Sequence, residues 1–148
     1  MKNLKILVIN GPNINLTGTR EPVVYGTQTL DGINRSVTES AESLGISVDF
    51  YQTNHEGEII DRIQDSVGLY DGIILNAGAY SHYSYAIRDA VTAVSVPVIE
   101  VHMSNIYARE DFRRVSVISA VCAATVSGFG SFGYHLALAG LAERLKDI

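Results

Sequence analysis

The segment LKILVIN, residues 4–10, is a short apolar run that ends at an asparagine and is followed by Gly11 and Pro12. A continuous apolar run of this length, rich in β-branched residues, is typical of a strand in a sheet that is covered on both faces. Four later segments also favour strands, namely ISVDFYQT (46–53), DGIILN (71–76), VPVIEVH (96–102) and ATVSGF (124–129). We therefore expect five strands in one sheet.

Stretches with helical periodicity separate these segments, at residues 29–44, 56–69, 84–94 and 132–146. The first of them begins at Thr29, a good N-cap residue, and ends before Gly45, which suits the C-terminal end of a helix. Strands that alternate with helices predict parallel βαβ units with right-handed crossovers. The expected fold is α/β, a flavodoxin-like doubly wound five-stranded parallel sheet with helices on both faces, built as a single domain over residues 1–148.

The composition excludes several classes of protein. The 148 residues suit one domain with one core, and the formal net charge of −5 argues against a nucleic-acid partner. No apolar run reaches the roughly 18 residues of a membrane span, and the apolar part of MKNLKILVIN is too short for a secretory signal. We expect a cytoplasmic protein with no membrane partner, in which the single cysteine, Cys122, is a buried small side chain.

Polar residues gather where the predicted strands end. In open α/β sheets, ligands bind outside the carboxyl ends of the strands. The residues at these ends are Asn10, Asn13, Asn54, His55, Asn76, Glu100, His102 and Gly128. One edge of the sheet is therefore the predicted site.

Glu100 and His102 alternate along one predicted strand, so their side chains lie on the same side of it. A carboxylate beside a histidine favours one tautomer and stabilises the imidazolium, which suits an acid or base and its orienting partner. A metal site that also includes His82 is not expected, because the chain has no H-E-x-x-H motif, cysteine pair or aspartate cluster. A histidine that is merely hydrogen-bonded at a strand end stays an alternative.

Two further patterns bear on cofactors. Lysine occurs only at positions 2, 5 and 146, which excludes a P-loop and disfavours a Schiff base. The segment GFGSFG (128–133) fits the dinucleotide-binding pattern, but it lies in the last βα unit, and no later strand completes a nucleotide-binding half. We interpret it as a tight turn between strand and helix, and we expect no cofactor.

The long segment GPNINLTGTREPVVYG (11–26) carries Arg20 and Tyr25, which are bracketed by Gly18 and Gly26. Functional residues often lie on loops held by a rigid scaffold, and flanking glycines suit a loop that closes as a lid. Considered alone, the loop also allows a simpler interpretation, in which Tyr25 packs and Arg20 pairs with Glu21.

Four motifs follow one another in this chain: GPNINLTGTREPVVYG, NHEGEIIDRI, LNAGAYSHYSYAIRDA and PVIEVHMSNIYAREDFRR. Together they closely resemble the type II 3-dehydroquinate dehydratases of the shikimate pathway. The resemblance extends to the GFGSFGY turn and so covers essentially the whole chain. It implies elimination of water from 3-dehydroquinate to 3-dehydroshikimate through an enolate, without metal, organic cofactor or Schiff base. It also implies a homo-oligomer, usually a dodecamer built from trimers.

The resemblance assigns catalytic roles to five residues. Tyr25 corresponds to the base that removes the proton beside the ketone, and His102 to the acid that protonates the departing hydroxyl. A phenol with a reference pKa of about 10 needs help to act as a base near neutrality, and the guanidinium of Arg20 would lower the pKa of Tyr25. Asn13 would hold a water or hydroxyl that stabilises the enolate, and Glu100 would orient His102.

The same comparison of motifs implies the substrate contacts. They fall on Asn76, His82, Met103, Ser104 and Arg113, with Met103 and Ser104 contributing backbone amides, and on Asp89, which would reach the site from a neighbouring subunit. A competing hypothesis keeps the fold without the chemistry, as a catalytically silent flavodoxin-like module that binds a small molecule.

Overall fold

The computed structural model of the chain describes residues 3–19, 23 and 28–146. Its centre is a five-stranded parallel sheet with the order β2-β1-β3-β4-β5. The strands are β1 (Lys5–Asn10), β2 (Ser47–Gln52), β3 (Gly72–Asn76), β4 (Val98–His102) and β5 (Ala124–Ser127). The prediction of a flavodoxin-like doubly wound sheet is confirmed.

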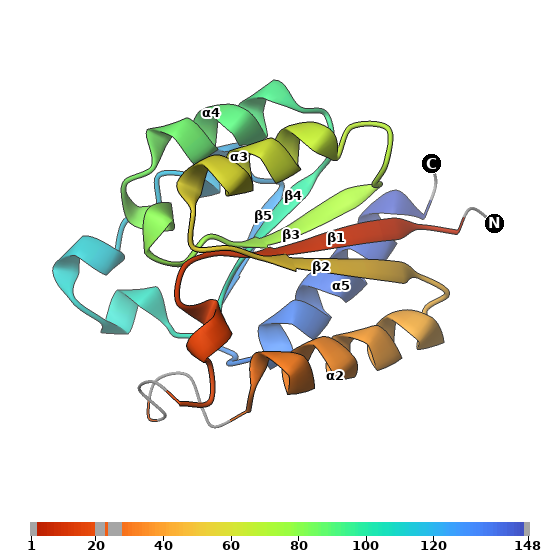
Figure 1. Cartoon of the computed structure of the whole chain (residues 1–148), viewed down its shortest axis with the longest axis horizontal. Helices are drawn as coiled ribbons and strands as arrows, with labels where there is room; N and C mark the ends of the chain where they lie inside the picture. The colour runs from red at the N-terminus through yellow and green to blue at the C-terminus, as the bar shows by residue number, and fades with distance from the viewer. Residues whose placement is uncertain (1–2, 20–22, 24–27, 147–148) are drawn as a thin grey trace.

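Helices cover both faces of the sheet, as Figure 1 shows: α2 and α5 lie on one face, and α3 and α4 lie on the other. Their bounds are α2 (Leu30–Ser43), α3 (Glu56–Asp65), α4 (Tyr85–Ala93) and α5 (Phe132–Leu145). Short 3-10 helices occupy the connections: η1 (Ile14–Leu16), η2 (Gly78–His82), η3 (Ile106–Ala108), η4 (Asp111–Arg113) and η5 (Ser119–Val121). In the part of the chain that the structure describes, no helix is long and apolar enough to span a bilayer.

The ends of α2 and α3 follow local chemistry. Thr29 caps α2 as predicted, because its side chain accepts a hydrogen bond of 3.2 Å from the backbone of Gly32. The helix predicted over 56–69 ends earlier, at Asp65. The reason is that the Ser66 hydroxyl donates to the carbonyl of Ile63, and Gly68 then turns the chain with a φ of +80°.

The core consists of two layers, one on each side of the sheet. Along β1, Ile6 and Val8 pack toward α2 and α5, whereas Leu7 and Ile9 pack toward α3 and α4. This alternation explains why the strand is apolar at successive positions, since both faces are covered. Cys122 packs at the edge of the second layer, where burial raises the pKa of its thiol to about 12. The thiol is therefore a poor nucleophile, as its apolar setting predicts.

The segment GFGSFG is the turn between β5 and α5, in agreement with our interpretation. Gly128 and Gly130 have positive φ angles of 95° and 58°, which glycine adopts without strain.

Two glycines bring the ends of β1 and β3 together, at the point where the strand order reverses. The backbone amide of Gly11 donates to the carbonyl of Asn76 at 2.7 Å, and a Cβ atom on Gly11 would lie 2.7 Å from the carbonyl oxygen of Ala77. Gly78 has a φ of +59°, and a Cβ there would lie 3.1 Å from the carbonyl oxygen of Pro12. The two loops therefore touch backbone to backbone, which fixes the edge of the sheet where ligands bind.

This close contact predicts that Gly11→Ala destabilises the fold. The added methyl group would force the Gly11 and Ala77 loops apart, at a cost of about 1–3 kcal/mol in the free energy of unfolding. Urea denaturation at equilibrium measures this loss. The matched control is Gly57→Ala on the exposed face of α3, where the added atom meets open space and helix propensity improves stability by up to about 1 kcal/mol. Equal stability of Gly11→Ala and the parent would contradict the analysis.

Candidate active site

A cleft of about 90 Å³ opens at the carboxyl ends of β1, β3 and β4. Seven of the predicted site residues line it: Asn13, Asn76, His82, His102, Met103, Ser104 and Arg113. The prediction did not include the remaining lining residues, which are Pro12, Ile14, Gly78, Ala79, Ile106 and Arg109. The cleft therefore lies at the edge of the sheet where the carboxyl ends of the strands predicted the site.

The other four predicted residues have different positions. Arg20 and Tyr25 lie outside the described residues, as do residues 21–22, 24 and 26 of the loop that was expected to act as a lid. Asp89 is exposed on α4 and does not line the cleft of its own chain. Glu100 is fully buried and contacts His102 from behind the cleft.

Glu100 and His102 form a hydrogen-bonded pair on β4. The Nε2 atom of His102 lies 2.5 Å from an Oε2 atom of Glu100, and two serine hydroxyls also donate to this carboxylate. Ser116 donates to Oε2 at 2.6 Å, and Ser119 donates to Oε1. A carboxylate without exposed surface requires such donors, because burying a charge without partners is very costly.

The charge on Glu100 is preserved by these contacts. Burial acts to raise the pKa of Glu100, but the hydrogen bonds from His102, Ser116 and Ser119 and the charge of the imidazolium outweigh it and lower the pKa. The group is therefore a carboxylate at neutral pH, and it accepts the Nε2 proton of His102. This arrangement fixes the orientation of the ring, with Nε2 toward the carboxylate.

His82 stacks on His102, with ring centroids 5.9 Å apart and planes at 23°. Its Nδ1 atom donates to the carbonyl of Val115 at 2.8 Å, because a carbonyl can only accept. Burial lowers the pKa of His82, and it outweighs the opposing effect of the bond to Val115. The neutral ring therefore carries its proton on Nδ1, which leaves Nε2 as a hydrogen-bond acceptor.

Two arginines lie on another wall of the cleft. The Nε atom of Arg113 donates to Glu110 at 2.8 Å, and Nη1 of Arg109 donates to the hydroxyl of Ser104 at 3.3 Å. Both side chains are largely buried, and guanidinium groups suit the binding of a carboxylate. We refer to Arg109 and Arg113 as the arginine pair.

Sequence reasoning missed Arg109 because the local pattern does not distinguish it. Three arginines occur within the segment AREDFRR, and the η3 and η4 turns decide which of them face the cleft. Arg114 is more exposed than the other two and pairs with Asp111 at 3.3 Å. The choice among the three therefore depends on tertiary structure.

Asn13 lies in the connection that follows β1, at the N-terminal end of η1. Its φ of 69° makes it the one non-glycine residue with a left-handed backbone among those that the structure describes, a conformation that asparagine tolerates better than most residues. Its backbone amide donates to the side chain of Asn54 at 3.0 Å. The turn that directs Asn13 toward the cleft is thus fixed by a residue that follows β2.

Asn76 is the last residue of β3, and its side chain is tied on both sides. Its Oδ1 atom accepts a hydrogen bond of 3.2 Å from the backbone amide of Gly78, and its Nδ2 atom donates to the hydroxyl of Tyr134 at 2.9 Å. The sequence patterns did not point to Tyr134, which looks like an ordinary core residue of a helix. Within the described part of the chain, no group of three or more His, Cys, Asp or Glu residues could hold a metal ion.

Comparisons with known proteins match nearly the whole chain to one family. A family model described as Dehydroquinase class II matches residues 4–142. The chain is 53% identical to a 3-dehydroquinate dehydratase of Bacillus cereus (strain AH187) over 143 residues, which are 97% of this chain and 98% of the relative. The crystal structure of type II dehydroquinase from Butyrivibrio crossotus DSM 2876 matches with a TM-score of 0.92 and 48% identity, over 94% of this chain and 97% of the other.

A second solved structure gives the same result. The type II dehydroquinase from Propionibacterium acnes has a TM-score of 0.92 and 43% identity to this chain, with 97% of this chain and 98% of the other covered. Identities of this size over nearly the full length of each protein go well beyond a shared fold. The chain therefore belongs to the class II dehydroquinase family.

Proposed function

We propose that this protein is a hydro-lyase that converts 3-dehydroquinate to 3-dehydroshikimate and water through an enolate, with Tyr25 as the base and His102 as the acid. The observation that carries the proposal is the buried pair of Glu100 and His102 at the cleft, with its carboxylate held ionised by two serines. A histidine that an ionised carboxylate orients toward the cleft suits the protonation of a departing hydroxyl.

Substrate binding uses the rest of the cleft. The arginine pair and the backbone amides of Met103 and Ser104 suit the carboxylate and hydroxyls of a small acid. Neutral His82, with Nε2 as an acceptor, receives a hydrogen bond from a substrate hydroxyl. Asn76 binds a further substrate oxygen.

The elimination then proceeds in two proton transfers. Tyr25, as the tyrosinate, removes a proton from the carbon beside the ketone, and the electron pair forms the enolate. Collapse of the enolate expels the hydroxyl, which takes a proton from His102 and leaves as water. Asn13 holds a water or hydroxyl that donates to the enolate oxygen, so negative charge is stabilised where it develops.

The base depends on Arg20, which precedes Tyr25 by five positions. A phenol is a weak base near pH 7, and a nearby guanidinium favours its anion without losing its own proton. Both residues lie outside the described part of the chain, so their roles rest on the resemblance of the REPVVYG motif.

We also propose a homo-oligomer, in which Asp89 of one subunit reaches the cleft of its neighbour. The exposure of Asp89 on α4, outside the cleft of its own chain, supports this role. The assembly implied by the resemblance is a dodecamer built from trimers.

The first prediction is the activity itself. Purified protein given 3-dehydroquinate produces a rise in ultraviolet absorbance from the conjugated enone of the product. Borohydride added together with substrate leaves the enzyme active, because no imine forms. No absorbance rise at micromolar enzyme would favour instead the silent binding module.

A second prediction concerns the acid. Glu100→Gln replaces an acceptor with an amide that faces two serine donors and the Nε2 proton of His102, so we expect kcat to fall at least about tenfold. His102→Ala removes the acid and lowers kcat by about a hundredfold or more. Glu58→Gln is the matched control, since Glu58 pairs with His55 at 3.8 Å outside the cleft. Parent-like turnover by His102→Ala would refute the assignment.

The ionised state of Glu100 also predicts a dependence of stability on pH. Its pKa is lowered in the folded protein, so its contribution to stability is present above the unfolded value of about 4.5 and is lost as the pH falls through the folded pKa. Urea denaturation at a series of pH values from 7 to 3 should therefore show a shallower acid decline for Glu100→Gln than for the parent. Identical slopes would show that the carboxylate is not stabilised by folding.

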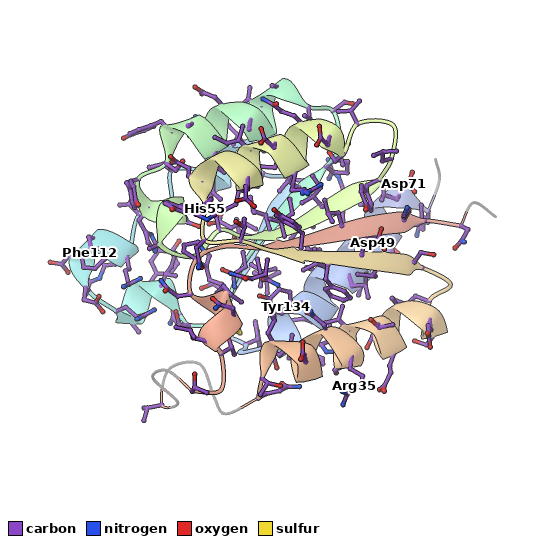
Figure 2. The ribbon with its side chains drawn as sticks, viewed as in Figure 1. Arg35, Asp49, His55, Asp71, Phe112 and Tyr134 are labelled. Atoms are coloured by element: carbon purple, nitrogen blue, oxygen red, sulfur yellow. The ribbon has the colours of Figure 1, made fainter. Side chains whose placement is uncertain are left out.

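A further prediction concerns the base. Tyr25→Phe lowers kcat by at least about a hundredfold, and Arg20→Ala both lowers kcat and raises the apparent pKa of the base in the pH profile. Arg35→Ala is the control, because Arg35 extends from the exposed face of α2 (Figure 2). A fully active Tyr25→Phe variant would exclude Tyr25 as the base.

A further inference from the structure

Three buried side chains form a hydrogen-bonded chain beneath the cleft, and only one of them has a part in the proposed reaction. They are Asn10 at the end of β1, Asn76 at the end of β3 and Tyr134 in the first turn of α5. Each has at most 3% of its surface exposed. Figure 2 shows Tyr134 between the sheet and the layer of α2 and α5. We call these residues the buried chain.

The contacts of the buried chain are short and continuous. The Nδ2 atom of Asn76 donates to the Tyr134 hydroxyl at 2.9 Å, and this hydroxyl donates to Oδ1 of Asn10 at 2.6 Å. At the other end, the backbone amide of Gly78 donates to Oδ1 of Asn76 at 3.2 Å. Polar groups at this depth need partners, so each bond constrains the next.

The backbone amide of Gly78 sets the direction of every bond in the buried chain. A backbone N–H group can only donate, so the atom of Asn76 that faces it is the oxygen. The Asn76 amide nitrogen then faces the hydroxyl of Tyr134. This hydroxyl accepts from Asn76, so its single hydrogen is donated in a hydrogen bond to the oxygen of Asn10. If the Asn76 amide were reversed, its NH₂ group would oppose the Gly78 donor.

We propose that Tyr134 is a positioning residue, which holds the Asn76 amide so that its second Nδ2 hydrogen is presented to an acceptor oxygen of the substrate. The proposal rests on the dehydratase function above, because it assigns Asn76 a substrate oxygen. It adds that Asn76 recognises this oxygen as a donor and that its amide group is held in place from inside the core by Tyr134. Tyr134 itself does not touch the substrate.

The surroundings of Tyr134 suit this role. Its ring packs in the core with Val101, Leu138 and other apolar residues, so the ring has little freedom to move. Burial raises the pKa of the phenol, and the hydrogen bond from Asn76 only partly opposes this effect. The hydroxyl therefore keeps its proton over the whole range in which the enzyme works, and the direction of the bonds is preserved.

The test compares KM and kcat in Tyr134→Phe, which removes one oxygen and leaves the ring. Asn76 loses the acceptor that holds its Nδ2 group in place, so we expect KM to rise about five- to tenfold while kcat stays within about threefold of the parent. Partial unfolding would instead lower the active fraction, and hence kcat, without changing KM. The control is Tyr70→Phe, whose hydroxyl donates to Asp49 at 2.6 Å away from the cleft.

A double-mutant cycle separates positioning from general packing. In an Asn76→Ala background, Tyr134→Phe should change KM less than twofold, because the group that it positions is gone. If the effects of the two substitutions on KM simply multiply, Tyr134 does not act through Asn76. An unchanged KM in Tyr134→Phe, with an active parent, overturns this inference alone, whereas an inactive parent counts against the proposed function.

A readout without turnover keeps the inference testable in either case. In ¹⁵N-labelled parent, the side-chain amide of Asn76, assigned from the Asn76→Ala spectrum, should exchange slowly with water, and this protection should be lost in Tyr134→Phe. Should that variant fold poorly, Asn10→Ala removes the far acceptor and is expected to release the same protection. Equal protection in the parent and a folded variant would refute the proposal.

Discussion

The backbone of Gly11 passes so close to that of Ala77 that no side chain fits between them, and the cleft is built on this contact. The chain leaves β1 toward α2 on one face of the sheet and leaves β3 toward α4 on the other. Such a divergence opens a space between neighbouring strand ends. Because the Gly11 and Ala77 loops touch, this space stays narrow, and residues after β1 and β3 line the same cleft.

A buried negative charge imposes the second constraint. Glu100 has no exposed surface, so its carboxylate is tolerable only where donors surround it. The donors come from its own strand, through His102, and from the connection that leads to β5, through Ser116 and Ser119. The orientation of His102 in the cleft is thus set from behind by the buried charge of Glu100.

How far the sequence predicts this protein follows from which interactions are local. The strands, the Thr29 cap and the site residues at strand ends were predictable, because parallel strands bring their carboxyl ends to one edge. Arg109, Ser119 and Tyr134 were not predictable. The 3-10 turns and the packing of α5 against the sheet decide where these side chains point, and the sequence pattern does not show this. The end of α3 was misjudged for a similar reason, because the turn at Gly68 competes with a pattern that still looks helical.

The serines that hold Glu100 also end the segment that carries the arginine pair. This segment leaves β4 after His102, forms η3 and η4, and returns to the carboxylate of Glu100 at Ser116. One ionised group therefore anchors both His102, which we propose as the acid, and the segment that carries the arginine pair. In genetic terms, substitutions at Ser116 or Ser119 should be epistatic with substitutions at His102 and in the arginine pair. The two halves of the cleft that these residues form are therefore not expected to evolve independently.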